Sequence, residues 1–165
     1  MTHDRFVVVP AAYVFLLRPA PGAPGVEEVL LQLRRGTGFM DEHWAAGAAG
    51  HVERGETAYD AARREAAEEL GITDLDLRFE LTMQRTRDGA PIDERVDFFF
   101  TARRWSGEPR VVEADRSAGL RWCRLDRLED DLPGPVVPHE RAALAALGTG
   151  TPYLTHGFDR EGATA

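Results

Sequence analysis

The 165-residue sequence contains no lysine and no asparagine, and its single cysteine is Cys123. A lone cysteine cannot form a disulfide within the chain, so we expect packing alone to stabilise the fold and the protein to work in a reducing compartment. Apolar runs stop well short of the ~20 residues that span a bilayer, which argues against a membrane protein. Residues 1–5 lack the apolar stretch of a signal peptide, and we therefore expect a cytoplasmic location.

Because lysine is absent, all 20 basic residues are arginines, and 28 acidic residues bring the formal net charge to -8. Codon bias in a GC-rich genome explains such a composition, and selection for the bidentate grip of arginine on phosphate is the alternative. A net acidic chain lacks the basic surface of a general nucleic-acid binder, so we expect no nucleic-acid polymer as a partner. A phosphate-bearing substrate would need a local group of arginines.

The length suits one domain, which we place at 1–165, with its core at about 5–147 and a loosely ordered tail at 148–165. The order of strand and helix patterns predicts an α/β (α+β) fold with a mixed sheet flanked by helices. The patterning predicts strands at 6–17, 27–33, 75–85, 95–105 and 120–125, helices at 57–70 and 140–147, and irregular stretches at 34–50 and 126–138.

The helix predicted at 57–70 has clear start and stop signals. Thr57 can cap the first turn, and Asp60, three residues later, lies near the positive end of the helix dipole. Gly71 follows the last turn as a C-cap. An apolar stripe marks the face that we expect to pack on the core, and it consists of Tyr59, Ala62, Ala66 and Leu70.

Three carboxylates, Glu65, Glu68 and Glu69, share the neighbouring face of this helix. They repel one another, at a cost of roughly 1 kcal/mol in total, so an ordinary solvated acidic face is one interpretation. A divalent cation would turn each repulsion into an attraction, which makes a metal site the other interpretation. Oxygen ligands without soft partners favour Mg²⁺ or Mn²⁺ over zinc.

The residues around the acidic face follow the order G-x5-E-x7-R-E-A-x-E-E-L-G-I, formed by Gly50, Glu56, Arg64, Glu65, Glu68, Glu69, Gly71 and Ile72. This order resembles the signature of the Nudix hydrolase family, G-x5-E-x7-R-E-U-x-E-E-x-G-U, in which U is usually a bulky aliphatic residue. Ala66 departs from that preference, and Ala49 stands where many members carry proline. Neither departure removes a charge. The stretches 34–44 and 122–128 are also similar to bacterial members, so the resemblance extends over most of residues 5–147.

The resemblance implies an α/β/α sandwich and metal-dependent hydrolysis of a nucleoside diphosphate linked to a further group X. It implies Glu65, Glu68, Glu69 and the carbonyl of Gly50 as ligands of Mg²⁺ or Mn²⁺. Glu56 resembles the position that pairs with Arg64, and this pair would hold the loop and the helix in register. Dimers are frequent among relatives, so a homodimer fits the resemblance.

Substrate contacts and the general base are less defined. Arg34, Arg35 and Arg54 are the nearest arginines in sequence to the substrate loops, and we prefer Arg35 for a phosphate contact. Phe39 and Trp44 can stack on a base or belong to the local core. We treat His51 as structural. The candidates for the general base are Glu68, Glu69, Glu94, Glu113 and Asp115.

The leading functional hypothesis is hydrolysis of a nucleoside or deoxynucleoside triphosphate to a monophosphate and pyrophosphate. ADP-ribose, a nucleotide sugar or a dinucleoside polyphosphate is the alternative within the same chemistry. An isopentenyl diphosphate isomerase shares the fold and would use a cysteine, for which Cys123 is the candidate. A nucleotide-sensing domain without catalysis is the hypothesis from another class, and such domains typically lose the carboxylates that are retained here.

Overall fold

The computed structural model describes residues 5–158, and its centre is an eight-stranded mixed sheet with the strand path β3-β2-β1-β6-β5-β8. Strand β4 pairs with β1, and β7 pairs with β2. The strands are β1 (Val9–Pro19), β2 (Glu27–Arg34), β3 (Trp44–Ala46), β4 (Ala48–His51), β5 (Leu77–Arg85), β6 (Arg95–Ala102), β7 (Ser117–Arg124) and β8 (Tyr153–His156). The helices are α1 (Ala58–Leu70), α2 (Leu128–Asp131) and α3 (Pro138–Ala146), with short 3-10 turns η1 (Pro91–Asp93) and η2 (Leu125–Arg127).

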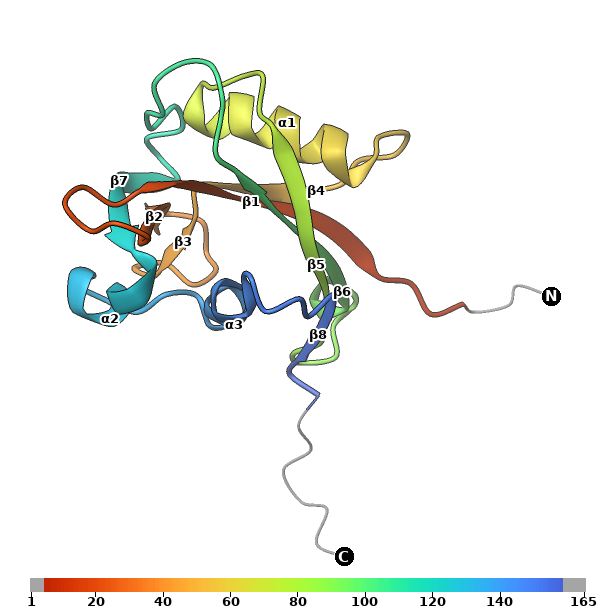
Figure 1. Ribbon diagram of the computed structural model, residues 1–165. Helices are drawn as coiled ribbons and strands as arrows, with labels where there is room; N and C mark the ends of the chain where they lie inside the picture. The colour runs from red at the N-terminus through yellow and green to blue at the C-terminus, as the bar shows by residue number, and fades with distance from the viewer. Residues whose placement is uncertain (1–4, 159–165) are drawn as a thin grey trace, which may run out of the picture.

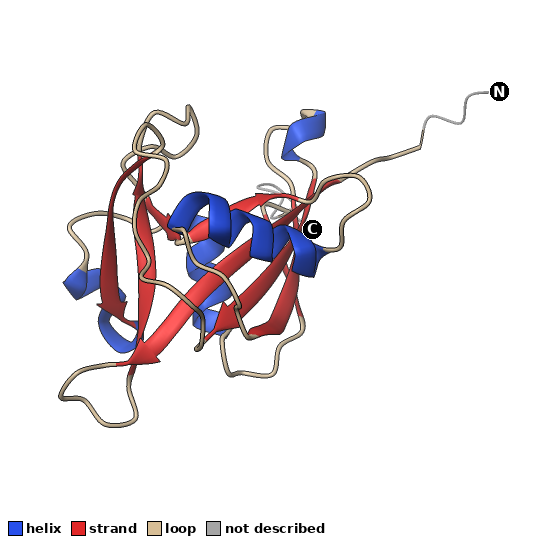
Figure 2. Ribbon diagram, turned by 90° about the horizontal axis from the view of Figure 1, so that it is seen from above, coloured by secondary structure: helices blue, strands red, loops and turns tan. Residues whose placement is uncertain are grey.

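Helices α1 and α3 lie on opposite sides of the strands (Figure 1), which confirms the expected sandwich of a mixed sheet flanked by helices. Figure 2 shows α1 lying across the strands on its side. Side chains alternate along β1, so Phe15 belongs to the core under α3, and Val14 and Leu16 belong to the core under α1. Strand β1 is therefore buried on both faces, and it lies at the centre of the sheet.

Helix α1 confirms the predicted signals at both ends. The Thr57 hydroxyl accepts from the backbone N–H of Asp60, whose carboxylate accepts in turn from the backbone N–H of Thr57. Gly71 ends the helix in the left-handed conformation, with φ of 68°. Ala62, Ala66 and Leu70 are buried as predicted, but Tyr59 is 41% exposed and packs beside the ring of Phe100 instead.

Several predicted boundaries were wrong. Strand β1 begins at Val9, because Phe6 and Val7 are exposed. The stretch 34–50, predicted as irregular, contains β3 and β4, which pair with β2 and β1. Helix α2 forms inside the loop predicted at 126–138.

The tail at 148–165 was predicted to be loosely ordered, yet β8 forms there and pairs in parallel with β5. Residues 159–165 lie outside the described residues. In the described part of the chain, no helix is both long and apolar enough to cross a bilayer.

Candidate active site

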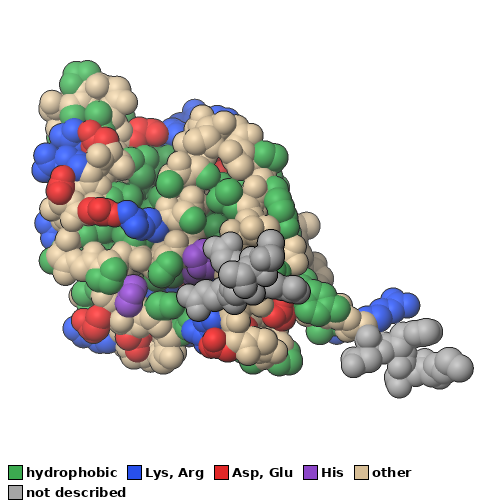
Figure 3. Space-filling view, turned by 90° about the horizontal axis from the view of Figure 1, so that it is seen from below, with side chains coloured by type: hydrophobic (Ala, Val, Ile, Leu, Met, Phe, Trp, Pro, Cys, Tyr) green, Lys and Arg blue, Asp and Glu red, His purple; other side chains and the backbone are tan. Residues whose placement is uncertain are grey.

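A cavity of about 710 Å³ lies between the α3 side of the sheet, the loop that follows β2 and the C-terminal half of α1. Its lining is rich in charged side chains from both halves of the chain. Figure 3 shows the molecule from the side of α3 and β8, where acidic and basic side chains are interspersed on the surface. A site for a charged small molecule fits this lining better than a surface for a polymer.

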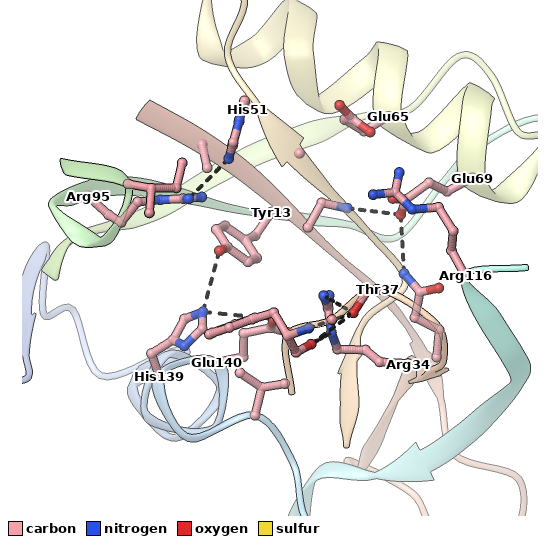
Figure 4. A pocket seen from close by; sticks show the side chains of 18 of the residues that line it. Tyr13, Arg34, Thr37, His51, Glu65, Glu69, Arg95, Arg116, His139 and Glu140 are labelled. Atoms are coloured by element: carbon pink, nitrogen blue, oxygen red, sulfur yellow. Dashed lines mark hydrogen bonds and ion pairs between the residues drawn. The ribbon is translucent and has the colours of Figure 1, made fainter. Parts of the chain in front are cut away.

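Glu65 and Glu69 project from α1 toward one end of the cavity (Figure 4). The carboxylate of Glu69 accepts hydrogen bonds from the backbone N–H of Ala49, at 3.1 Å, and from the side-chain amide of Gln32, at 3.2 Å. Glu65 lies against the backbone of Gly50, where a Cβ atom would come within 1.9 Å of Glu65 Oε1. Only glycine at this position leaves room for the Glu65 carboxylate. We call this region the acidic end of the cavity.

Burial sets the electrostatics of the acidic end. Desolvation raises the pKa of Glu69 to about 8, although the hydrogen bond from Ala49 opposes the shift, and desolvation also raises the pKa of Glu65. Neighbouring carboxylates add to both shifts, because Glu113 and Glu65 repel the charge on Glu69. A bound cation would stabilise the charged forms of these two carboxylates, because it offsets their repulsion and their loss of solvent.

Arg64, on the outer side of α1, links this helix to the loop that precedes it. Its guanidinium donates to Glu56 at 2.7 Å, to Glu65 at 2.6 Å and to the backbone carbonyl of His51 at 3.0 Å. A longer bond of 3.3 Å reaches Glu68. The hydrogen bonds from Arg64 lower the pKa of Glu56, so this carboxylate stays charged and keeps the loop attached to the helix. The contact between Glu56 and Arg64 is the one that the resemblance implies.

The side chains only partly prearrange a metal site. Glu65 and Glu69 line the cavity, whereas the side chain of Glu68 is 53% exposed and is not part of the lining. Among residues 5–158, no three acidic, histidine or cysteine side chains converge closely enough to hold an ion by themselves. The donors present are all oxygen atoms, and the Gly50 backbone lies beside Glu65, so the set fits a hard ion that completes its shell with water or substrate oxygens.

The arginine that lines the cavity from β2 is Arg34, not the preferred Arg35. Arg34 donates to the carbonyl of Phe39 and the hydroxyl of Thr37, both at 2.9 Å, while Arg35 and Arg54 are exposed and outside the lining. Phe39 does line the cavity, and the guanidinium groups of Arg34 and Arg87 lie 5.7 and 4.9 Å from its ring centre.

Trp44 packs in the core under α3, is 6% exposed and does not reach the cavity lining. Cys123 is fully buried in the same core, and burial raises the pKa of its thiol to about 11. It is absent from the cavity lining as well, so the isomerase hypothesis has no thiol at this site.

Two of the five candidates for the general base, Glu69 and Glu113, are part of the cavity lining. The carboxylate of Glu113 lies 3.7 Å from Arg116, which lines the cavity near Glu69. Glu94 instead accepts a hydrogen bond from the hydroxyl of Thr86, at 2.6 Å, outside the lining. Glu68 and Asp115 are also outside it.

The opposite end of the cavity holds a group of residues that the sequence analysis missed. Arg85 Nε donates to Asp97 Oδ2 at 2.5 Å, and Arg95 Nε lies 3.8 Å from Asp97 Oδ1. The Tyr13 hydroxyl lies 3.4 Å from both Arg85 Nη2 and His139 Nε2. We call this region the arginine end; its side chains are those of Tyr13, Arg85, Arg95, Asp97, His139 and Glu140. The available signal was a charged residue, Asp97, beside the apolar run of residues 98–100 in the same strand.

Burial keeps most of the titratable neighbours at the arginine end uncharged. Desolvation lowers the pKa of His139 to about 2, and the positive charge of Arg85 adds to this shift. Glu140 is 3% exposed, and its Oε2 accepts from the backbone N–H of Ala46 at 2.5 Å. Burial raises the pKa of Glu140 to about 7 despite that hydrogen bond.

Comparison with known proteins agrees with the fold and with the motif. The NUDIX domain family matches residues 8–147. A MutT NUDIX hydrolase from Burkholderia pseudomallei is 31% identical, with 83% of this chain and 97% of that chain covered and a TM-score of 0.66. A NUDIX hydrolase from Nitrosomonas europaea is 18% identical over 89% of this chain and 93% of that one, with a TM-score of 0.69.

A third similar structure is the NUDIX domain of NrtR from Shewanella oneidensis, solved as a cocrystal with ADP ribose. It is 15% identical, with 85% of this chain and 86% of that chain covered and a TM-score of 0.66. A search of curated proteins found no match.

Proposed function

The chain belongs to the Nudix hydrolase family, and we propose that it is a Mg²⁺- or Mn²⁺-dependent pyrophosphohydrolase of nucleoside diphosphate-X compounds. Nucleoside and deoxynucleoside triphosphates are the proposed substrates, with water adding to one phosphorus to release a monophosphate and pyrophosphate. The observation that carries this proposal is the placement of Glu65 against Gly50 and of Glu69 against Ala49 at one end of a cavity that arginines also line.

A bound divalent ion would supply charge neutralisation of the diphosphate and a lower pKa for the attacking water. Glu65, Glu69 and the Gly50 carbonyl are the proposed ligands, and Glu68 would join them after its side chain turns toward the cavity. Arg64 positions Glu65 from outside, because its guanidinium holds that carboxylate at 2.6 Å while it also binds Glu56.

The arginines in the lining bind the phosphate oxygens whose negative charge the metal ion does not neutralise. Arg34 approaches from β2, and Arg116 approaches beside Glu69 (Figure 4). Both guanidinium groups present planar N–H donors, which suit phosphate oxygens. Phe39 offers the adjacent ring for stacking. Glu113 and Glu69 remain the two proposed acceptors for the proton of the attacking water, because both carboxylates face the same end of the cavity.

ADP-ribose is the second candidate substrate, and a nucleotide sugar or a dinucleoside polyphosphate would require the same chemistry. The NrtR domain that resembles this chain binds ADP ribose, and at 15% identity the likeness extends to the fold. A sensing domain without catalysis is the competing function, and it is disfavoured because Glu65, Glu68 and Glu69 are all retained.

A substrate panel with Mg²⁺ and then Mn²⁺ tests the proposal directly. We expect turnover of at least one triphosphate, with monophosphate and pyrophosphate as the products. Turnover of ADP-ribose without any triphosphate would replace our first substrate with the second. If no diphosphate compound is hydrolysed, the hydrolase proposal fails and the sensing function takes its place. Reaction in ¹⁸O-labelled water, read by phosphorus NMR, identifies the phosphorus that water attacks.

A further inference from the structure

We propose that Arg85 and Arg95 form a second anion-binding site at the arginine end of the cavity, and that this site takes a phosphate group. Figure 4 shows Arg95 and His139 on the side of the cavity opposite Glu69 and Arg116. The site is therefore separate from the acidic end. The inference rests on the proposed function in one respect, which is that the phosphate belongs to the same substrate.

The two arginines are brought together by the sheet. Arg85 of β5 and Arg95 of β6 are direct cross-strand partners in the antiparallel register. Like charges in such positions destabilise a sheet unless a third group intervenes. Asp97 is that group, because it is fully buried and lies 2.5 Å from Arg85 and 3.8 Å from Arg95. One carboxylate thus serves two guanidinium groups.

The remaining neighbours do not supply the missing negative charge. His139 is neutral, because burial lowers its pKa to about 2, and burial likewise raises the pKa of the Tyr13 phenol. Glu140 is engaged with the backbone of Ala46, and with a pKa near 7 it carries only part of a charge at neutral pH. Arg85 is paired closely with Asp97, so the surplus positive charge falls on Arg95, whose side chain is only 12% exposed. Buried charge without a partner is costly, and a bound anion removes that cost.

The guanidinium donors at this end suit an oxyanion, and they are incompletely satisfied. Arg95 Nε and Asp97 Oδ1 face each other across 3.8 Å, and both are buried without a hydrogen-bond partner among residues 5–158, while Arg95 Nη1 lies 3.0 Å from His51 Nε2. Guanidinium groups donate and never accept, so they recognise acceptor-only groups such as phosphate. A cation would leave these donors unsatisfied and would add to the positive charge. Both arginines line the cavity, so a substrate phosphate has direct access to them.

The consequence for the substrate is that it carries a phosphate beyond the bond that is cleaved. The end phosphate of a polyphosphate chain, or a phosphate on the sugar, has the required chemistry. The acidic end does not need these two arginines, because Arg116 already lines the cavity beside Glu69. The chain therefore offers two separately charged subsites within one cavity of about 710 Å³.

Titration of the metal-free protein with inorganic phosphate, in the presence of a chelator, tests the site without any catalysis. We expect the ¹⁵N–H signals of Arg85 Nε and Arg95 Nε to shift, and Arg95→Gln to weaken the phosphate affinity at least tenfold. Arg95→Lys keeps the positive charge but loses the planar guanidinium group, so its phosphate affinity should lie between those of the wild type and Arg95→Gln. Arg104→Gln is the matched control, because Arg104 is 83% exposed and pairs with Asp76 on the surface; its affinity should equal that of the wild type.

The proposal is overturned if phosphate shifts neither signal, if only Arg34 and Arg116 respond, or if Arg95→Gln binds as the wild type does. Arg95→Gln leaves the bond between Arg85 and Asp97 in place, and Arg95→Lys provides the same comparison should the first variant not fold. Failure of the proposed function has a different signature. A protein that binds phosphate through Arg95 but hydrolyses no diphosphate compound would reject the hydrolase and keep the anion site.

Discussion

The two ends of the cavity have opposite charge and are built in different ways. At the acidic end, Glu65 and Glu69 stand on one helix, and backbone groups of β4 lie directly beside them. At the arginine end, Arg85 and Arg95 stand on two strands and share one buried carboxylate. The opposite charges of the cavity are therefore supplied by separate parts of the fold. Under our proposals a cation binds at one end and an anion at the other, so substitutions at each end should have separable effects.

The largest effect is expected from Glu69→Gln, which removes one charge from the acidic end. We expect kcat to fall by about 10³-fold, because the proposed metal loses a direct ligand. The fold should persist, since a glutamine keeps an oxygen for the N–H groups of Ala49 and Gln32. With a chelator present, the melting temperature near neutral pH should rise, because a carboxyl whose pKa burial raises to about 8 ionises more readily in the unfolded chain and so favours unfolding. Retained activity in this variant would refute the ligand assignment.

Asp97→Asn should have the largest effect on stability and acts at the arginine end. Removing the charge of Asp97 leaves Arg85 and Arg95 as two buried cations without a counter-ion. Breaking a buried pair in this way costs about 3–5 kcal/mol, measurable as the free energy of unfolding in urea. Asp76→Asn removes an exposed partner of Arg104 and should leave that free energy unchanged. Equal losses of unfolding free energy in the two variants would mean that Asp97 contributes no more to stability than an exposed ion-pair partner does. Added phosphate should restore part of the stability of Asp97→Asn.

Glu140→Gln separates the contribution of Glu140 from that of the two arginines through its pH dependence. The folded pKa of Glu140, about 7, lies above the ordinary value of 4.5, so the unfolded chain loses its proton at lower pH than the folded chain. Wild-type stability should therefore decline as pH rises from about 4.5 to 7, by about 3 kcal/mol through this group. The charged groups that act on Glu140 are Arg34, Arg85 and Asp97.

The measurement for Glu140 is the difference in unfolding free energy between wild type and Glu140→Gln at several pH values. Only the wild type should show this component of the slope, and the difference should become constant above about pH 8. His139 also acts in this window, because its folded pKa of about 2 lies below the ordinary 6.5 and makes stability rise with pH up to about 6.5, but this contribution is common to both proteins and cancels in the difference. A difference that is independent of pH would show that folding does not raise the pKa of Glu140.

The contrast between the two ends also explains what could be predicted from the sequence. Glu65, Glu69 and Arg64 lie within a few residues of one another, so helical periodicity and the Nudix signature located them together. The caps at Thr57 and Gly71 are local as well, and the structure confirms both. Short-range patterns of this kind are readable without any knowledge of the rest of the fold.

The arginine end depends on pairing between distant parts of the chain. Arg85 and Arg95 become neighbours through the register of β5 and β6, and His139 and Glu140 reach them from α3. The same reason explains why β3, β4 and β8 were missed, because these strands of three or four residues exist only through their partners. Arg35 was preferred over Arg34 although β2 ends at Arg34, because the direction in which each side chain faces at the end of a strand depends on the pairing of that strand.

The smallest effect is expected from Gly50→Ala, and it separates geometry from stability at the acidic end. A Cβ at Gly50 would lie 1.9 Å from Glu65 Oε1, so the flexible end of Glu65 must turn away while the backbone stays in place. We expect kcat/KM to fall about tenfold, equivalent to about 1.4 kcal/mol, with little change in melting temperature. Gly55→Ala is the matched control, because nothing lies within 4 Å of that Cβ but its φ of 91° strains alanine. That variant should lose about 1 kcal/mol of stability and keep its activity. If both variants lost activity in proportion to stability, the contact between Gly50 and Glu65 would be structural, and the acidic end would need no defined position for Glu65.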